Sequence, residues 1–344
     1  MIVLDFETTG LQVWSPEVKV VTCAWAWRED GEIKTRFSPS LSHVTADLER
    51  LAGTQQEIAV FNVGFEALVM LCKFPSLKLN IAVDVMRLVQ VYANDDSVMS
   101  YGLKPSAERI LGPEHGGWEK EIREWLISNG HKPHEYHRAP YEILRRYNVG
   151  DVVATLRLYE HITEEFAHTG YDWRFDHSLY FSSARHVVRA QAAGVLVQRE
   201  GLERYVEATQ ADLEANAAGF VEKYAEAVAE VEQRVTSKEQ AKFKKKIVQR
   251  VPFNIDSNTH REILFCDVLG MKPKFLTPGG SPSFKSEHLG TYGDAGKHLE
   301  DRKSRQIVLT QSKSLLALSE EDARWHVSLK MSGTSTGRFS GGQQ

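Results

Sequence analysis

The sequence predicts an α/β domain followed by a mainly helical segment. Short apolar runs typical of strands crowd into the first 62 residues, and later segments show the helical spacing of apolar residues. Residues 199–250 are rich in Ala, Glu, Lys, Gln and Arg and contain no proline. At 344 residues, the chain exceeds the roughly 100 to 200 residues of a typical single domain. Two domains are therefore expected.

The first part of the chain predicts strands. Apolar runs with strand character occupy residues 1–6, 18–27, 33–38 and 57–62. The turn sequence Glu-Asp-Gly at 29–31 makes the second and third of these a hairpin. Residues 43–52 have helical character. A sheet with at least one helix beside it is expected here.

Helices dominate from residue 64 onward. Helical spacing is found at residues 64–74, 84–93, 100–112 and 141–166, so the α/β domain is expected to end near residue 170. Residues 199–250 predict one long helix or a helical hairpin. A turn and a capped helix are expected in 251–265, a Gly/Pro-rich loop in 274–284, and an exposed tail at the end.

Charge divides the chain into two parts. Residues 1–175 hold 25 acidic and 18 basic side chains, whereas residues 176–344 hold 21 acidic and 24 basic ones. An acidic part suits a metal-loaded site, and a basic part suits a polyanion.

The three cysteines form no CxxC pair, which favours a reducing cytosol over a disulfide framework. No apolar run approaches the roughly 18 residues that span a bilayer, so no membrane partner is expected.

Two acids end the first strand. Asp5 and Glu7 share one face of that strand, and Phe6 points into the opposite layer. Two carboxylates so close repel each other unless cations lie between them, and hard cations such as Mg²⁺ and Mn²⁺ prefer carboxylate oxygen. An isolated Asp-x-Glu is more often a strand end exposed to solvent. Whether Asp5 and Glu7 form a metal site therefore depends on which other polar residues the chain supplies.

Two further blocks accompany these acids. In VFNVGFEAL a strand runs into Asn62, and a helix carries Glu66 four residues later. In RRYNVGDVV, Tyr147 and Asp151 lie on one face of a helix. A third cluster, of the histidines His131, His134 and His137, is a less convincing metal site. Its spacing fits no zinc signature, and Pro133 would interrupt a helix that could align the three side chains.

These blocks resemble the Exo I, Exo II and Exo III motifs of DEDDy exonucleases, and the opening MIVLDFETTG resembles the proofreading domain of bacteriophage-type family-A DNA polymerases. The resemblance implies a ribonuclease-H-like domain, a mixed β-sheet flanked by helices. It implies two divalent cations, Mg²⁺ or Mn²⁺, and 3′-5′ hydrolysis of DNA to 5′-mononucleotides. The implied catalytic residues are the metal ligands Asp5, Glu7, Glu66 and Asp151, together with Tyr147, which positions the attacking water.

The second motif departs from the family pattern. It usually ends in Asp, whereas this chain has Glu66, which makes weak activity or a preference for Mn²⁺ plausible. Asp84 resembles a family Asp that supports the site from a helix start. A helix N-cap is an equally good interpretation of Asp84.

The resemblance also implies DNA contacts. Thr8 matches the residue that holds the terminal nucleotide, and Leu11 matches the apolar wedge against the last bases. Each could instead be an ordinary turn or core residue. Seven basic residues between Arg234 and Arg250 suit phosphate contacts along a polymerase thumb, or simply a solvated face. The full set of implied DNA-binding residues is Thr8, Leu11, Asn62, Lys244, Lys245, Lys246 and Arg338.

The second half resembles the same family in order as well as kind. Residues 184–199, 253–270, 277–289 and 326–340 resemble the approach to the thumb, the thumb and the start of the palm. We therefore expect an exonuclease domain at 1–172 and a truncated polymerase part at 173–344. The palm and fingers motifs are missing, so this chain is not expected to polymerise. It would be a fragment, or half of a split polymerase.

The implied partners are a single-stranded DNA 3′ end, a primer-template duplex and a separate or missing palm and fingers. The implied location is the cytoplasm, that of the host if a phage encodes the chain. Two alternatives stay open. One is a stand-alone DEDDy ribonuclease of the ribonuclease D kind. The other is a DNA-binding or assembly subunit with an inactive exonuclease fold, which Glu66 in place of Asp would explain.

Overall fold

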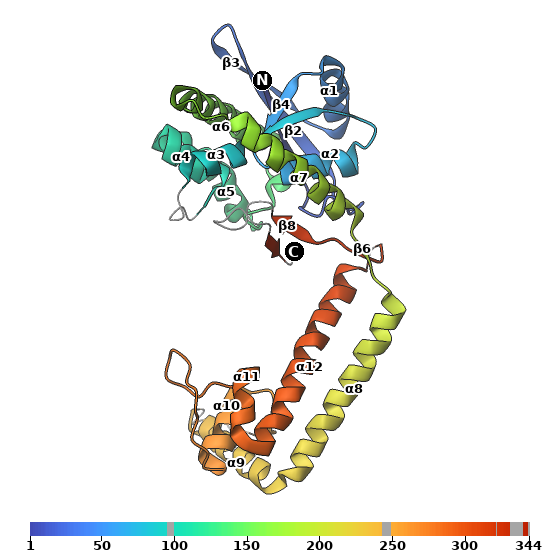
Figure 1. The fold of residues 1–344 in the computed structure, drawn as a ribbon, viewed down its shortest axis with the longest axis vertical. Helices are drawn as coiled ribbons and strands as arrows, with labels where there is room; N and C mark the ends of the chain where they lie inside the picture. Colours follow the sequence, from blue (N-terminus) through green and yellow to red (C-terminus); the bar gives the residue numbers. More distant parts are fainter. Residues whose placement is uncertain (95–99, 243–248, 321, 331–339, 343–344) are drawn as a thin grey trace. The chain divides into compact units, whose positions relative to one another are not determined.

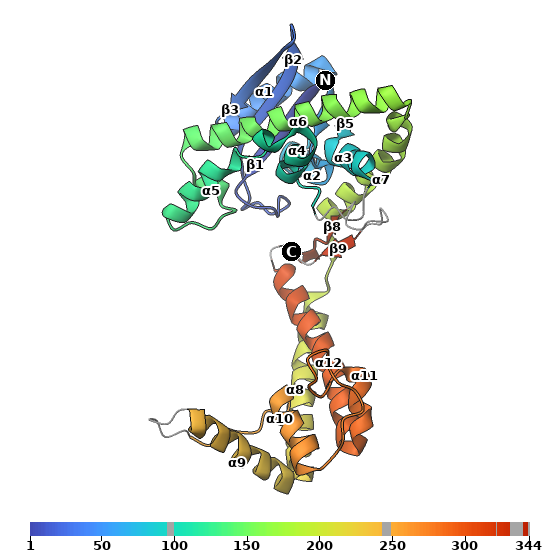
Figure 2. The same cartoon turned by 90° about the vertical axis from the view of Figure 1, so that its left-hand side faces the viewer.

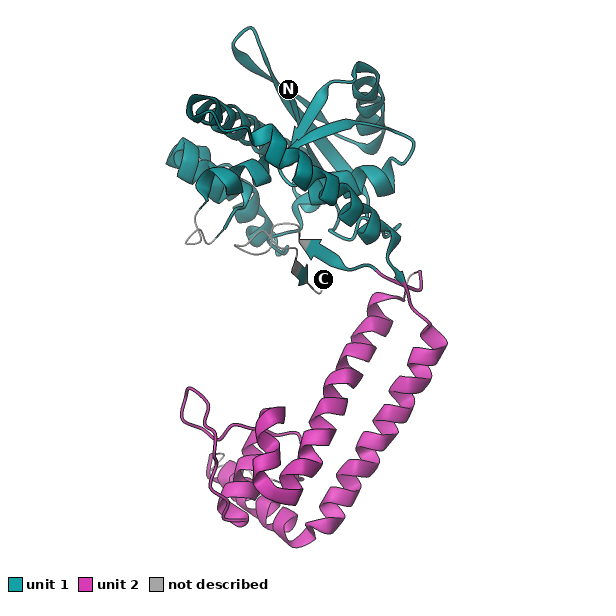
Figure 3. Cartoon of the chain, viewed as in Figure 1, with its two compact units in different colours: residues 1–195, 326–344 teal, residues 196–325 magenta. Residues whose placement is uncertain are grey.

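The computed structural model describes residues 1–94, 100–242, 249–320, 322–330 and 340–342. The chain forms two compact units (Figure 3). Unit 1 comprises residues 1–195 and 326–344, and unit 2 comprises residues 196–325. Within the described residues, no helix is long and apolar enough to cross a membrane.

Unit 1 is built on a five-stranded mixed sheet. Its strands are β1 (Ile2–Thr8), β2 (Val20–Glu29), β3 (Glu32–Ser38), β4 (Glu57–Val60) and β5 (Asn80–Asp84). Their order is β3-β2-β1-β4-β5, with antiparallel β3-β2-β1 and parallel β1-β4-β5. The predicted hairpin is confirmed: Asp30 and Gly31 between β2 and β3 both have positive φ, at 50° and 78°. Such a pair suits a tight two-residue turn.

Helices cover both faces of this sheet (Figure 1, Figure 2). They are α1 (Leu41–Thr54), α2 (Val63–Lys73), α3 (Val85–Ala93), α4 (Leu103–Leu111), α5 (Glu119–Ser128), α6 (Tyr141–Thr169) and α7 (Trp173–Ala193), with short 3₁₀ turns at Pro113–His115 and Tyr136–Arg138. The predicted helices at 43–52, 64–74, 84–93, 100–112 and 141–166 correspond to α1, α2, α3, α4 and α6. Strand β5 and helices α5 and α7 were not predicted.

Alternation along β1 divides the core into two layers. Leu4 and Phe6 pack with α1, α2 and α7 on one side of the sheet. Val3 packs with α3, α4 and α6 on the other side. Asp5 and Glu7 share the parity of Val3, so their side chains lie on the α6 side. The prediction that Phe6 occupies the opposite layer is confirmed.

Helix α7 belongs to the core of unit 1. Its residues Phe181, Ala184, Val187 and Val188 are buried in the same cluster as Leu4. The compact unit therefore extends past residue 172, where the sequence placed the change from exonuclease to polymerase. That family boundary stays a prediction. The chain also returns to unit 1, where His326 stacks on Trp14 with ring centroids 4.7 Å apart.

Unit 2 is mainly helical and has a core of its own. It contains α8 (Arg199–Lys223), α9 (Ala225–Lys242), α10 (Asn258–Glu262), a π-helical turn (Ile263–Val268), α11 (Ser286–Leu289), a 3₁₀ turn (Gly290–Tyr292) and α12 (Gly293–Leu318). The two long helices α8 and α12 lie side by side (Figure 1). Phe220, Phe265 and Tyr292 are among its fully buried side chains. The predicted cap of α10 is confirmed: Ser257 accepts from the backbone N–H of His260.

The described residues also contain four short strands: β6 (Val195–Leu196), β7 (Arg324–Trp325), β8 (Ser328–Lys330) and β9 (Ser340–Gly342). Strands β8 and β9 pair antiparallel.

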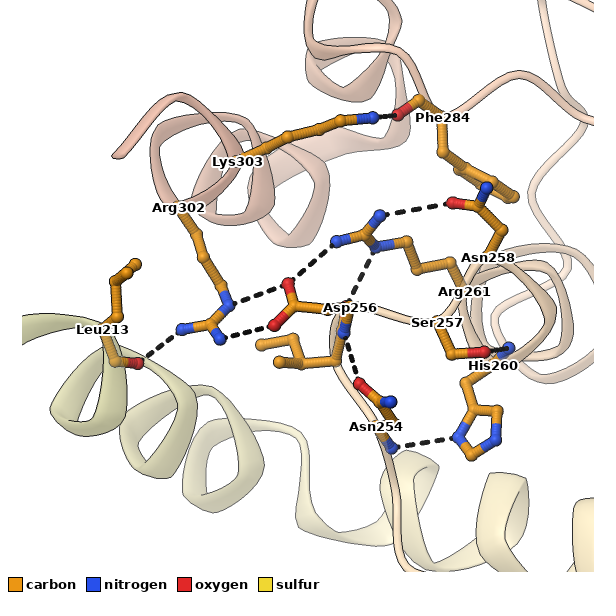
Figure 4. Close-up of polar contacts among 11 residues, drawn as sticks. Leu213, Asn254, Asp256, Ser257, Asn258, His260, Arg261, Phe284, Arg302 and Lys303 are labelled. Atoms are coloured by element: carbon orange, nitrogen blue, oxygen red, sulfur yellow. Dashed lines mark hydrogen bonds and ion pairs between the residues drawn. The ribbon is translucent and has the colours of Figure 1, made fainter. Parts of the chain in front are cut away.

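A charged network ties the helices of unit 2 together (Figure 4). Asp256 accepts from Arg302 of α12 at 2.6 Å and from Arg261 of α10 at 3.3 Å. Arg302 also donates to the backbone oxygen of Leu213 in α8. Both arginine side chains are almost fully buried. Asp256 and Arg302 together therefore link α8, α10 and α12.

Candidate functional site

Three carboxylates converge beside the central strand. Asp5 and Glu7 of β1 and Asp151 of α6 each offer an oxygen, and these oxygens all lie within 4.8 Å of one another. It is the one group of potential metal-ligating side chains with such spacing in the described part of the chain. Oxygen donors alone suit a hard divalent cation.

Helix α6 brings Asp151 to the strand because it packs across β1 and β2. Tyr147 lies one turn before Asp151 and is also buried. Between them, fully buried Asn148 donates to Asp5 Oδ2 at 2.6 Å and accepts from the Thr22 hydroxyl at 3.2 Å. Asn148 thus holds one carboxylate of the cluster from the same helix that supplies another. No sequence pattern predicted this role of Asn148.

Glu66 approaches the same acids from the first turn of α2. Glu66 is 4% exposed, and its Oε2 has no hydrogen-bond partner within the described part of the chain. It lies outside the three-residue cluster, although Asp5 and Glu7 both repel it electrostatically. A buried carboxylate oxygen without a partner is costly, and a cation is one way to satisfy it. Glu66 as a metal ligand stays a prediction.

The pKa values of the clustered carboxyl groups are raised above their ordinary values. Burial, and then the charge of Asp151, raises the pKa of Asp5 well above its ordinary value. Burial and the charge of Asp5 do the same for the pKa of Glu7 and of Glu66. Such mutual repulsion is the condition that a divalent cation relieves. The donor set therefore fits a divalent metal ion.

Lys104 and Trp118 contact Asp151, and no sequence pattern predicted either contact. Lys104 Nζ donates to Asp151 Oδ2 at 2.6 Å and to the Tyr147 hydroxyl at 3.0 Å. Trp118 Nε1 donates to the other oxygen, Oδ1, at 2.5 Å. Neither residue belongs to a recognisable motif. Their roles follow from tertiary packing of α4 and of the turn before α5 against α6, which no local pattern encodes.

Tyr147 keeps its proton in this environment. Burial and the nearby charge of Asp151 raise the pKa of its hydroxyl far above the usual range. The hydroxyl can therefore donate or accept a hydrogen bond, but it cannot act as a base near neutral pH.

Asp84 lies outside the cluster. It caps α3, with its side chain accepting from the backbone N–H of Met86 at 3.1 Å and from the Tyr180 hydroxyl at 2.7 Å. Burial raises its pKa to about 7. The cap interpretation of Asp84 is confirmed.

The other predicted residues are spread around the site. The Thr8 hydroxyl donates to the backbone oxygen of Gly10 at 2.6 Å, and Leu11 is 72% exposed. Asn62 takes the N-cap position of α2 without a side-chain cap bond. Lys244, Lys245, Lys246 and Arg338 lie outside the described residues. DNA contacts by these residues stay predictions.

No protein-family model matches the chain, and no curated protein matches it in sequence. Among solved structures, the chain is similar to the POL domain of Pol1 from M. smegmatis in complex with DNA primer-template and dNTP. The TM-score is 0.63 at 15% sequence identity, covering 99% of this chain and 50% of that one. The chain thus shares the fold of that protein and spans about half its length.

Proposed function

We propose that this chain is the 3′-5′ proofreading exonuclease part of a bacteriophage-type family-A DNA polymerase, followed by its thumb region. The observation that carries the proposal is the convergence of Asp5, Glu7 and Asp151 beside Tyr147. Each comes from a motif block that resembles an exonuclease motif. The mixed sheet flanked by helices agrees with a ribonuclease-H-like exonuclease domain.

The proposed roles follow from the local contacts. Asp5, Glu7 and Asp151 would hold Mg²⁺ or Mn²⁺, with Glu66 as the fourth ligand. When bound, the two cations supply activation of water and charge stabilisation at the leaving 3′ oxygen. The protonated Tyr147 hydroxyl orients the attacking water, because it keeps its proton and lies one helical turn from Asp151. The product would be a 5′-mononucleotide.

The proposed substrate is a DNA 3′ end, single-stranded or at a primer-template junction. Thr8, Leu11 and Asn62 would contact it near the acids, and the basic residues of unit 2 would contact duplex phosphates. The chain spans about half of its structural neighbour. We propose that palm and fingers, in the same protein or a separate chain, supply the polymerising activity.

A second function is favoured by the two hydrogen bonds that Asp151 accepts from the protein. Both oxygens of Asp151 already accept hydrogen bonds from the protein, one from Lys104 and one from Trp118. A site closed in this way suits a DNA-binding or assembly subunit that keeps the exonuclease fold without its chemistry. A ribonuclease of the ribonuclease D kind would use the same acids on RNA.

One experiment separates these functions. A 5′-labelled single-stranded DNA and its RNA counterpart are incubated with the chain and Mg²⁺ or Mn²⁺, with EDTA as a control. Asp5→Asn removes a cluster charge, and Asp30→Asn removes an exposed one at the β2–β3 turn as the matched control.

Metal-dependent shortening of DNA from the 3′ end, lost in Asp5→Asn and kept in Asp30→Asn, is the expected result. Faster cleavage of RNA would favour the ribonuclease. Intact DNA and RNA with every metal would contradict the proposal and favour the DNA-binding subunit.

A further inference from the structure

Lys104 lies in the acid cluster, although it belongs to none of the motif blocks. It occupies the first turn of α4, next to buried Leu103. Its side chain is only 18% exposed. The ammonium lies 4.5 Å from the ring centroid of Tyr147 and 5.6 Å from that of Trp118. Two aromatic faces and one carboxylate therefore fix the position of this cation.

The ammonium supplies positive charge to an acidic, buried site. Among the described residues, Lys104 is the basic residue that forms an ion pair with the clustered acids. Its charge also acts favourably on the Asp5 and Glu7 carboxylates, which have no ion-pair partner of their own in the described part of the chain. Several carboxylates buried this close together need positive charge nearby to be stable. Lys104 provides part of it.

The two protein donors on Asp151 differ in their freedom to leave. The Trp118 indole is a rigid ring, and a Cβ on Gly150 of α6 would lie 2.4 Å from it. Lys104 reaches Asp151 through a flexible four-carbon stem and has a second contact in the Tyr147 hydroxyl. If one donor withdraws from Asp151, it is therefore Lys104.

We propose that Lys104 is a built-in competitor of the divalent cation: its ammonium neutralises Asp151, and metal binding requires it to withdraw from Oδ2. The inference rests on the proposed function, because it presupposes a metal site at these acids. Two cations cannot share one carboxylate oxygen at contact distance without strong mutual repulsion. Lys104 therefore lowers the affinity of the free protein for metal.

The test measures metal binding rather than activity. The full chain without DNA is titrated with Mn²⁺, and free Mn²⁺ is followed by electron paramagnetic resonance. Lys104→Met keeps a long side chain and removes the charge, Lys104→Arg keeps the charge, and Glu7→Gln removes a proposed ligand. Lys120→Met, at an exposed lysine of α5, is the matched control for loss of one positive charge.

We expect Lys104→Met to bind Mn²⁺ about tenfold more tightly than the parent chain, since a competing charge is gone. Lys104→Arg and Lys120→Met should bind like the parent, and Glu7→Gln should bind more weakly. A second variant, Lys104→Gln, should behave like Lys104→Met, and circular dichroism shows which variants are folded.

Two outcomes would overturn the inference in different ways. Unchanged or weaker Mn²⁺ binding in folded Lys104→Met and Lys104→Gln, with normal binding by the parent, would remove Lys104 as a competitor and leave the proposed function standing. No Mn²⁺ binding by the parent or by any variant would remove the metal site, and with it both proposals.

Discussion

Glu66 differs from the other acids of the site in having a fully buried carboxylate oxygen, Oε2, with no hydrogen-bond partner among the described residues. The neighbouring Oδ atoms of Asp151 are both hydrogen-bonded, and Asp5 accepts from Asn148. Burial and repulsion by Asp5 make the charged form of Glu66 costly in the folded protein. A residue that costs stability and offers a free oxygen beside other acids has the properties of a functional ligand.

Opposite effects on activity and stability are expected for Glu66→Gln. The exonuclease rate with Mg²⁺ should fall by about a hundredfold, because a negative ligand is lost. The free energy of unfolding at neutral pH should rise, because a buried charge with an unsatisfied oxygen is removed. Initial rates on a 5′-labelled oligonucleotide and urea denaturation measure the two effects.

The matched control is Glu57→Gln, at an exposed position where β4 begins. It should change neither the rate nor the stability appreciably. An unchanged rate in Glu66→Gln would show that Glu66 is not a ligand and that three acids suffice.

Asn148 acts on Asp5 through a single hydrogen bond, and Thr22 orients its amide. Asn148→Ala should lower kcat by about ten- to a hundredfold with little change in KM for DNA, because Asp5 loses its orientation rather than a substrate contact. Steady-state kinetics with varied DNA concentration measures both constants. Thr22→Val, which removes only the outer partner, should have a smaller effect. A loss confined to KM would instead make Asn148 a DNA contact.

At the scale of elements, the sequence was informative where a local pattern encodes the structure. The alternation of Leu4, Asp5 and Phe6 predicted which side chains share a layer, and the Asp-Gly turn predicted the β2–β3 hairpin. Strand β5 was missed because its five residues run directly into the helical pattern of α3. Its pairing with β4 is a long-range contact that propensity does not reveal.

The candidate site shows the same division. The residues that could be predicted occupy fixed positions in the three motif blocks, and they are Asp5, Glu7, Glu66, Tyr147 and Asp151. Lys104 and Trp118 reach Asp151 from segments 47 and 33 residues away. Asn148 lies within a motif block, but its amide matters only through the contact with Asp5. Contacts of this kind depend on how α4 and α6 pack, and a single sequence gives no pattern for them.

Helix α7 forms hydrogen bonds with Asp84, the buried last residue of strand β5. Tyr180 of α7 donates to Asp84, and His177 of α7 accepts from the backbone N–H of Asp84 at 3.0 Å. Burial raises the pKa of Asp84 from 3.8 to about 7, so the folded state binds this proton more tightly than the unfolded state. The resulting stabilisation is present below about pH 4 and is lost as the pH rises through about 7.

Asp84→Asn should remove this pH dependence. The amide stays neutral and keeps an oxygen for the Met86 N–H, so the variant should gain stability relative to the parent as the pH rises from 4 to 7. Linkage limits the gain to at most about 4 kcal/mol. Urea denaturation of both proteins at several pH values measures the difference between their free energies of unfolding. Titration of other groups, such as His177, contributes equally to both proteins and cancels in this difference. A difference that stays constant with pH would contradict the raised pKa.

At the scale of the whole molecule, each compact unit has its own core. Unit 1 packs its helices on the two faces of the sheet, and unit 2 gathers its buried aromatic residues between α8, α9 and α12. Separate cores allow separate unfolding transitions. A ligand that binds one unit, or a substitution within it, should then shift one transition and leave the other in place.

Asp256→Asn tests this independence within unit 2. The substitution keeps the shape of the side chain but removes the one negative partner that the described residues give to the nearly buried Arg261 and Arg302. Burial and the charge of Arg302 already lower the pKa of Arg261, and Asp256 opposes that shift. We expect unit 2 to lose about 2 to 3 kcal/mol, less than for a fully buried pair because Asp256 is partly exposed.

Differential scanning calorimetry with and without Mn²⁺ measures the effect. In Asp256→Asn, one transition should move to lower temperature, while the transition that Mn²⁺ raises should keep its midpoint. Asp301→Asn, which breaks an exposed pair with Arg305 on α12, is the matched control and should cost less than about 0.5 kcal/mol. Equal shifts of both transitions in Asp256→Asn would contradict the independence of the two units, because a loss confined to the Asp256 network should leave the stability of unit 1 unchanged.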